Sequence, residues 1–212
     1  MKIQLLPTTF DQNGHATQQQ HLSCFVVNDC VAIDAGSLAM STNEKQKKQI
    51  RDVILTHAHL DHIAGLPLFI DDLFATIRRP IQIHATQEVI DALENHIFNW
   101  TIYPRFSELK NANGDVVCYR PFQVMEKVEI QNLTFQTIEV NHKVPTIGMI
   151  VSDEKSKIAL TSDTAQMDGF WELINNQENC DALLIECAFP NELSELAKSS
   201  HPYKQPPSVA DP

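Results

Sequence analysis

Three histidines and an aspartate lie within six residues, directly after a short apolar stretch. The stretch 52–56 (DVILT) is short, apolar and β-rich, so it predicts a buried strand. His57 and His59 follow it two residues apart, which in an extended chain places both side chains on one side, where they can bind one metal ion. Asp61 and His62 come where the chain turns into a helix and can face a second ion. This density of ligands indicates a metal site rather than a packed core.

Four side chains so close together cannot complete two metal shells, so other segments must contribute ligands. His142 follows an expected strand at 133–140, and Asp163 follows one at 157–161. A single histidine or aspartate after a strand is more often a turn or surface residue. The shared position of these two at strand carboxyl ends, downstream of the histidine motif, favours a ligand role for both. Imidazole nitrogens and carboxylates suit Zn²⁺, with Mn²⁺ or Fe as alternatives.

The rest of the chain predicts an α/β fold. Strands are expected at 3–9, 24–27, 31–33, 52–56, 81–84, 116–119, 123–130, 133–140, 147–151, 157–161 and 182–186. Helices are expected at 43–51, up to about 78, from 87 to 99 after an N-cap at Thr86, at 167–176 and at 192–198. Hairpin turns are expected at Asn132 and at 152–155. The pattern favours one α/β sandwich domain, residues 1–198, followed by an irregular proline-rich tail, 199–212.

Charge and composition argue against several functional classes. Lysine and arginine number 16 against 27 aspartates and glutamates, so the 212 residues carry a net charge of −11. An acidic surface repels phosphate backbones, which argues against nucleic-acid partners. No apolar stretch approaches the roughly 20 residues of a membrane span, and residues 1–7 lack the apolar segment of an export signal. The five cysteines form no CxxC pair, as is typical of a reduced, cytoplasmic protein.

The motifs and their order are similar to those of a known family. The segment 57–66 (HAHLDHIAGL), then His142, then 162–164 (SDT), resembles the metallo-β-lactamase superfamily. The finer resemblance is to the class II 3′,5′-cyclic-nucleotide phosphodiesterases. The stretch 57–65 fits each position of their signature, which is H-x-H-L-D-H, an aliphatic residue, any residue and glycine. Three further stretches also resemble this family: 20–23, 34–38 and 185–193. The resemblance covers about residues 20–198.

The resemblance implies a four-layer αβ/βα sandwich with a dinuclear metal site at one sheet edge. It implies three ligands for the first ion, two for the second and one that bridges both: His57, His59 and His142; Asp61 and His62; and Asp163. Two metals roughly 3.5 to 4 Å apart would polarise a shared water to hydroxide at neutral pH. In-line attack on cyclic AMP or cyclic GMP would expel the 3′ oxygen and yield the 5′-monophosphate. The implied partner is therefore a small cyclic nucleotide, and a homodimer is left open.

The end of the chain departs from the family pattern. The superfamily has a further histidine ligand on a late loop after one more strand, and the family carries Gly-His-Leu-Thr-Pro where this chain reads Ser-Ser-His-Pro-Tyr at 199–203. His201 matches the histidine of that motif, which could protonate the leaving oxygen, so Asp61 and His201 are the expected catalytic residues. The chain stops eleven residues after His201. The favoured explanation is a truncated chain that lacks its last strand and helix, and the alternative is that His201 replaces the missing ligand.

Other functions stay open at this point. The chain could be another hydrolase of the same superfamily, such as a thioesterase, a lactonase or an RNA-processing enzyme, or a catalytically impaired metal-binding remnant. Leu60 within the histidine motif and the matches near both ends of the chain favour cyclic nucleotides. The net charge of −11 argues against RNA.

The missing histidine ligand generates a prediction about metal content. The isolated protein is expected to hold the first ion well and the second poorly, because the second ion lacks one ligand. Metal analysis after dialysis checks this, and two equivalents of tightly retained zinc would contradict it.

Overall fold

The chain forms two compact units, and each is described by itself. The computed structural model describes residues 1–17, 19, 21–165, 167–177 and 179–186. The first unit spans Met1–Gln123, and the second begins at Val124. The expected helix at 192–198 and the tail at 199–212 lie outside the described residues. The single domain boundary at 198 stays a prediction.

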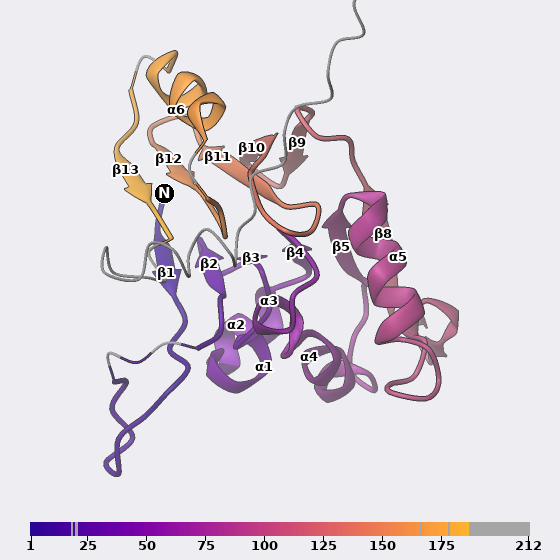
Figure 1. The fold of residues 1–212 in the computed structure, drawn as a ribbon. Helices are drawn as coiled ribbons and strands as arrows, with labels where there is room; N and C mark the ends of the chain where they lie inside the picture. The colour runs from indigo at the N-terminus through magenta and orange to yellow at the C-terminus, as the bar shows by residue number, and fades with distance from the viewer. Residues whose placement is uncertain (18, 20, 166, 178, 187–212) are drawn as a thin grey trace, which may run out of the picture. The chain divides into compact units, whose positions relative to one another are not determined.

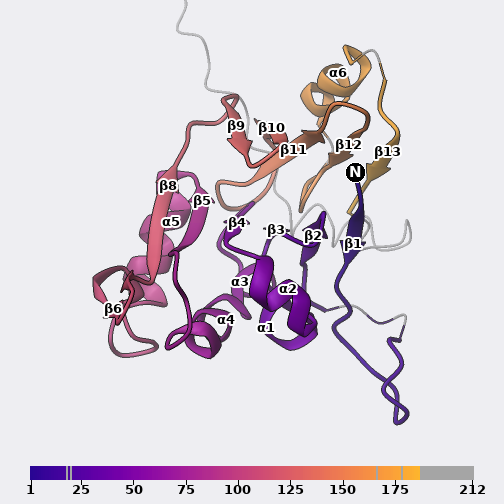
Figure 2. The ribbon, with the colours of Figure 1, turned by 180° about the vertical axis from the view of Figure 1, so that it is seen from behind.

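Unit 1 is built on a six-stranded sheet in the order β1-β2-β3-β4-β5-β8. Its strands are β1 (Ile3–Leu5), β2 (Phe25–Val27), β3 (Val31–Ile33), β4 (Asp52–Ile54), β5 (Ile81–Ala85) and β8 (Val117–Pro121). The first three strands pair antiparallel, whereas β3, β4, β5 and β8 pair parallel. A small hairpin of β6 (Lys110–Asn111) and β7 (Gly114–Asp115) is visible in Figure 2. The parallel strands matter most, because their carboxyl ends meet at one edge of the sheet.

Five α-helices of unit 1 connect these strands. They are α1 (Leu38–Ser41), α2 (Glu44–Gln49), α3 (Leu60–Ile63), α4 (Leu66–Leu73) and α5 (Gln87–His96), with a 3₁₀ turn at Phe106–Glu108. Helix α2 begins at a capping box, in which the Asn43 side chain accepts from the Gln46 N–H and the Gln46 side chain accepts from the Asn43 N–H. Among the described residues, no helix has the length and apolar character needed to cross a membrane.

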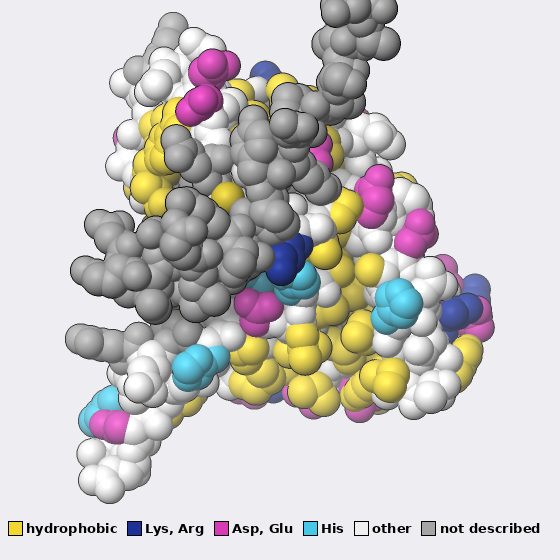
Figure 3. All heavy atoms as spheres, in the orientation of Figure 1, with side chains coloured by type: hydrophobic (Ala, Val, Ile, Leu, Met, Phe, Trp, Pro, Cys, Tyr) yellow, Lys and Arg dark blue, Asp and Glu magenta, His cyan; other side chains and the backbone are white. Residues whose placement is uncertain are grey.

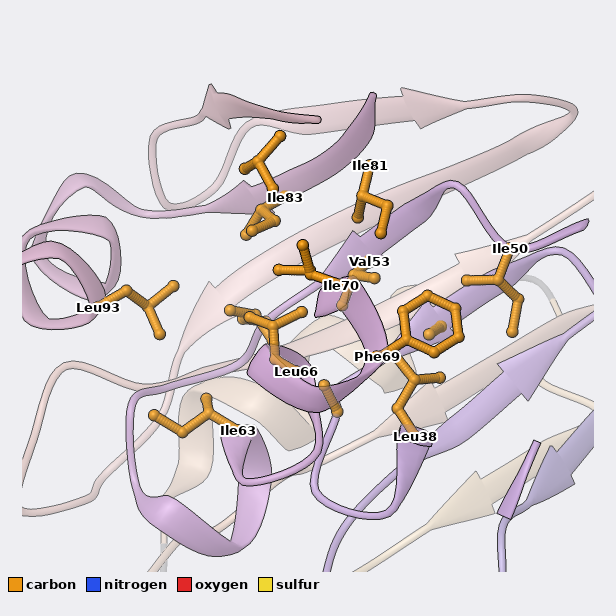
Figure 4. Close-up of a cluster of buried hydrophobic side chains, with 14 of the residues drawn as sticks. Leu38, Ile50, Val53, Ile63, Leu66, Phe69, Ile70, Ile81, Ile83 and Leu93 are labelled. Atoms are coloured by element: carbon orange, nitrogen blue, oxygen red, sulfur yellow. The ribbon is translucent and has the colours of Figure 1, made fainter. Parts of the chain in front are cut away.

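The core of unit 1 lies between the sheet and its helices. Alternate strand residues such as Val53 and Ile83 point toward α4, whose buried side chains include Phe69 and Ile70 (Figure 4). Phe69 is fully buried. Because the short helix α3 continues almost directly into α4, this packing also fixes the segment that carries the histidine motif.

Unit 2 is built on a five-stranded sheet in the order β13-β12-β11-β10-β9. Its elements are β9 (Lys127–Ile130), β10 (Leu133–Glu139), β11 (Ile147–Ser152), β12 (Lys157–Leu160), α6 (Asp168–Asn175) and β13 (Ala182–Leu184). Strands β9 to β12 pair antiparallel and β13 joins β12 in parallel. Helix α6 lies beside β12 and β13 (Figures 1 and 2), and its buried Phe170 packs with Val140, Ile150 and Ala159.

The sequence predicted the α/β class and most strands. Both expected hairpin turns are confirmed, since Ile130 pairs with Leu133 across Asn132 and Ser152 pairs with Lys157. The second turn has a clear cause, because the Asp153 carboxylate accepts the N–H groups of Lys155 and Ser156.

Some boundaries differ from the expectation for identifiable reasons. The helix expected up to 78 is two helices, α3 and α4, separated at Gly65. The helix expected to reach Asn99 ends at His96, because the Asn99 side chain accepts the N–H groups of Thr101 and Ile102 and starts a turn. Thr86 occupies the N-cap of α5 without a side-chain cap bond.

A close approach at Gly36 ties the loop after β3 to helix α3. A methyl group at Gly36 would lie 1.9 Å from the Asp61 carbonyl oxygen and 2.9 Å from the Ser23 nitrogen. These two groups are already bonded to each other, since the Ser23 N–H donates to the Asp61 carbonyl at 2.8 Å. Only glycine therefore fits between the histidine segment and the loop at Ser23.

We expect Gly36→Ala to destabilise the protein by about 3 kcal/mol or more, because backbone atoms must move to make room. Chemical denaturation measures this change. Gly169→Ala in α6 is the matched control, because its methyl group would meet only ordinary contacts of 3.8 and 3.9 Å. A Gly36→Ala protein as stable as the control would contradict the packing described.

Candidate metal centre

The histidine motif lies at the carboxyl edge of the parallel strands in unit 1. Asp34 follows β3 and His57 follows β4, and the Asp34 N–H donates to the Ile54 carbonyl at 2.8 Å, so the pairing continues past the strand ends. Parallel strands bring residues that follow neighbouring strands to the same edge. The sheet therefore delivers these polar side chains to one place.

Unit 1 brings together the four site residues predicted from the motif. The ring centroid of His57 lies 4.7 Å from that of His59 and 4.0 Å from that of His62. The His62 Nε2 lies 3.6 Å from the Asp61 Oδ2. His57 and His62 are buried, whereas the Asp61 side chain is half exposed. Two of the four predicted ligands are therefore buried, and the Asp61 carboxylate is accessible to solvent.

A buried carboxylate, Asp34, contacts the histidine motif, and no role was predicted for it from the sequence. The Asp34 Oδ2 lies 2.7 Å from the His62 Nδ1, and its Oδ1 accepts the Thr56 N–H at 2.8 Å. Asp34 is only 2% exposed and has a φ of +58°, a left-handed conformation that aspartate tolerates better than most residues. The available signal was the stretch 34–38, which resembles the phosphodiesterase family at a strand end.

The hydrogen bonds of this cluster fix which nitrogen of each histidine carries its proton. An ionised carboxylate only accepts, so His62 donates its Nδ1 proton to Asp34 and keeps a lone pair at Nε2. The Thr56 hydroxyl lies 3.0 Å from both Asp34 oxygens and donates its one proton there. Thr56 therefore accepts from the His57 Nδ1, 3.0 Å away, and His57 also keeps its lone pair at Nε2. One carboxylate thus prepares two histidines for metal binding.

Unit 2 brings together the other two predicted ligands. His142 lies in the connection between β10 and β11, which is closed by the Val140 N–H donating to the Thr146 carbonyl at 3.0 Å. Asp163 follows β12. The His142 Nε2 lies 4.0 Å from the Asp163 Oδ2, and His142 is buried.

Hydrogen bonds around Thr164 hold the two loops of unit 2 against each other. The Asn141 N–H donates to the Thr164 Oγ1 at 3.2 Å, and the Asn141 carbonyl accepts from the Ala165 N–H at 2.7 Å. The Glu186 carboxylate accepts the Thr164 N–H at 3.4 Å, so it braces the loop that carries Asp163. These bonds hold together the loops that carry His142 and Asp163, which follow β10 and β12.

The donor set fits divalent metal ions. Unit 1 supplies three imidazoles and one carboxylate, and unit 2 supplies one imidazole and one carboxylate, with ligand atoms within 4.8 Å of each other in each of the pairs His57–His59, Asp61–His62 and His142–Asp163. Nitrogen and carboxylate donors of this kind bind Zn²⁺, Mn²⁺ or Fe. The predicted catalytic residue His201 lies outside the described residues.

Comparisons with known proteins identify the family of this chain. The family model described as "Beta-lactamase superfamily domain" matches residues 27–206. A probable 3′,5′-cyclic-nucleotide phosphodiesterase of Yersinia pestis is 26% identical over 173 residues, which are 73% of this chain and 48% of that protein. A ribonuclease Z of Sulfurisphaera tokodaii is 24% identical over 129 residues, 59% of this chain and 39% of that protein. The chain thus spans less than half the length of both relatives.

Solved structures identify the fold. Unliganded yeast PDE1 superposes with a TM-score of 0.72 at 15% identity, over 94% of this chain and 78% of that one. At this identity the likeness shows the shared metallo-β-lactamase fold and not a shared substrate.

The cluster around Asp34 generates a test of metal affinity. Asp34→Asn removes the negative charge and turns one of the two acceptor oxygens into a donating NH2 group, so the side chain can no longer accept from both Thr56 and His62 through separate oxygens. We expect zinc affinity to fall about 10- to 100-fold, as is typical when the partner of a ligating histidine is removed. Competition with a chromogenic chelator measures it. Asp91→Asn, an exposed position on α5, is the control, and equal affinities in both variants would contradict the role given to Asp34.

Proposed function

Because the chain belongs to the beta-lactamase superfamily domain family, we propose that it is a metal-dependent hydrolase of 3′,5′-cyclic nucleotides, producing 5′-monophosphates from cyclic AMP or cyclic GMP. The observation that carries this proposal is the stretch 57–65, which matches the phosphodiesterase signature at each position, including Leu60. The similarity to a protein named as a probable cyclic-nucleotide phosphodiesterase supports it. Family membership itself supports a hydrolase that binds divalent metal.

In this proposal six side chains hold two metal ions. The first ion takes three ligands, the second takes two, and one carboxylate bridges them: His57, His59 and His142; Asp61 and His62; and Asp163. When bound, two divalent ions polarise a water molecule and stabilise charge on the phosphoryl oxygens. Zn²⁺ is the metal proposed first, because four of the six donors are imidazoles.

The residues of this chain then have separate tasks. Asp34 and Thr56 hold His62 and His57 with their Nε2 lone pairs available. The half-exposed Asp61 carboxylate is the group proposed to accept the proton of the attacking water. A bond forms between that water oxygen and phosphorus while the bond from phosphorus to the 3′ oxygen breaks, and the 3′ oxygen takes up a proton. His201 is proposed as the donor of that proton.

The cysteine pattern and the net charge also bear on the location and the partners of the protein. The cysteine pattern supports a cytoplasmic location, and the partner is a small cyclic nucleotide rather than a nucleic acid or a membrane. A homodimer remains a proposal without a specific interface.

An RNA-processing activity is the second candidate, because the chain is also similar to a ribonuclease Z. Processing enzymes must attract a polyanion over many nucleotides, and binding weakens when the protein surface is acidic. A net charge of −11 therefore favours the small substrate. The two candidates differ in substrate size, which a direct assay can resolve.

The test is to incubate purified protein with Zn²⁺ or Mn²⁺ and either cyclic AMP, cyclic GMP or a precursor RNA. We expect release of 5′-monophosphate that falls at least about 100-fold in His59→Ala, because one ligand of the first ion is lost. His96→Ala, an exposed histidine at the end of α5, is the matched control. Cleavage of the RNA alone would favour the second candidate, and nucleotide binding without turnover would support a non-catalytic remnant.

A further inference from the structure

Leu60 is the most exposed large hydrophobic side chain among the described residues, at 67%. It lies between two proposed metal ligands, His59 and Asp61, yet it is neither a ligand nor part of the core. The other apolar residue of α3, Ile63, is buried as expected. The residue that distinguishes the phosphodiesterase signature is therefore an apolar side chain left open beside the metal ligands.

Hydrogen bonds hold the backbone around the exposed Leu60 in place. The His62 N–H donates to the His59 carbonyl at 3.0 Å, and the Ala64 N–H donates to the Leu60 carbonyl at 2.8 Å. The Asp61 carbonyl is held by the Ser23 N–H against Gly36. These contacts hold the backbone that presents Leu60 at the surface.

The direction of the side chain follows from helix geometry. A side chain at the start of a helix leans toward the N-terminal end, and the N-cap of α3 is His59. Leu60 thus leans over the side of α3 on which the ligand loop lies. In Figure 3, hydrophobic side chains gather over the region of α3 and α4, and the exposed apolar residues of these two helices include Leu60 and Leu68.

We propose that Leu60 contacts the nucleoside part of the substrate and so contributes to specificity. The proposal rests on the proposed function, since a cyclic nucleotide has a charged phosphate joined to a sugar and base with apolar faces. The ligand groups take the phosphate end, and an adjacent fixed leucine gives the uncharged end a surface whose burial is favourable. The backbone restraints mean that no rearrangement is needed to present this surface.

Binding measurements test this without requiring turnover. Calorimetry with the full, metal-loaded chain compares 5′-AMP with inorganic phosphate in the wild type, Leu60→Ser and Leu60→Met. We expect Leu60→Ser to raise the Kd for 5′-AMP about three- to tenfold, as the loss of one apolar contact predicts, and to leave phosphate binding unchanged. Leu60→Met should bind 5′-AMP like the wild type. Leu68→Ser, an exposed leucine on α4, is the matched control and should change neither ligand.

The outcomes separate this proposal from the proposed function. If the wild type fails to hydrolyse cyclic nucleotides but Leu60→Ser still loses affinity for 5′-AMP selectively, the proposed reaction fails and the contact stands. Equal losses for 5′-AMP and phosphate would overturn the contact, because Leu60 would then only support the ligand loop. Unchanged 5′-AMP affinity would also overturn it, as would absence of 5′-AMP binding in the wild type.

Light scattering gives a further outcome. If Leu60→Ser leaves the 5′-AMP affinity unchanged but dissociates a dimer, the proposal is overturned, because a second copy of the chain then covers this leucine.

Discussion

The buried carboxylate of Asp34 is the interaction on which the rest of the candidate site depends. It lies at the end of one parallel strand and binds Thr56 at the end of the next, as well as His62 in the first turn of α3. A buried charge is tolerated only when its hydrogen bonds are satisfied, and here the satisfying groups belong to the segment that carries the ligands. The same hydrogen bonds therefore stabilise the buried charge and orient the two histidines.

The two units bring their predicted ligands together in different ways. Unit 1 places its four predicted ligands within six residues, so a single strand end and one helical turn suffice. Unit 2 takes His142 and Asp163 from separate loops and needs cross-links through Thr164 to hold them 4.0 Å apart. Glu186 adds a further brace from beyond β13. The second arrangement depends on hydrogen bonds between two loops, and the first depends mainly on local sequence.

This difference explains how much the sequence could predict. The histidine motif predicts metal binding from one short segment. The strands of unit 2 could be predicted from their alternating pattern and from their turn residues. Asp34 was given no role, because a lone aspartate before Ala35 and Gly36 looks like an ordinary turn until Thr56 and His62 are seen beside it. The helix break at Gly65 was equally hidden, since the apolar pattern continues through it and only the packing of the following helix reveals the change of direction.

The tight contact at Gly36 has a consequence for the order of events in metal binding. With Asp61 bound to Ser23 and no room for a side chain between them, the histidine segment is already held in one conformation by the fold. The conformational entropy of that segment is therefore lost when unit 1 folds rather than when an ion arrives. An incoming ion meets donors that are already in place, so its binding energy goes into affinity and selectivity among metals instead of into building the loop.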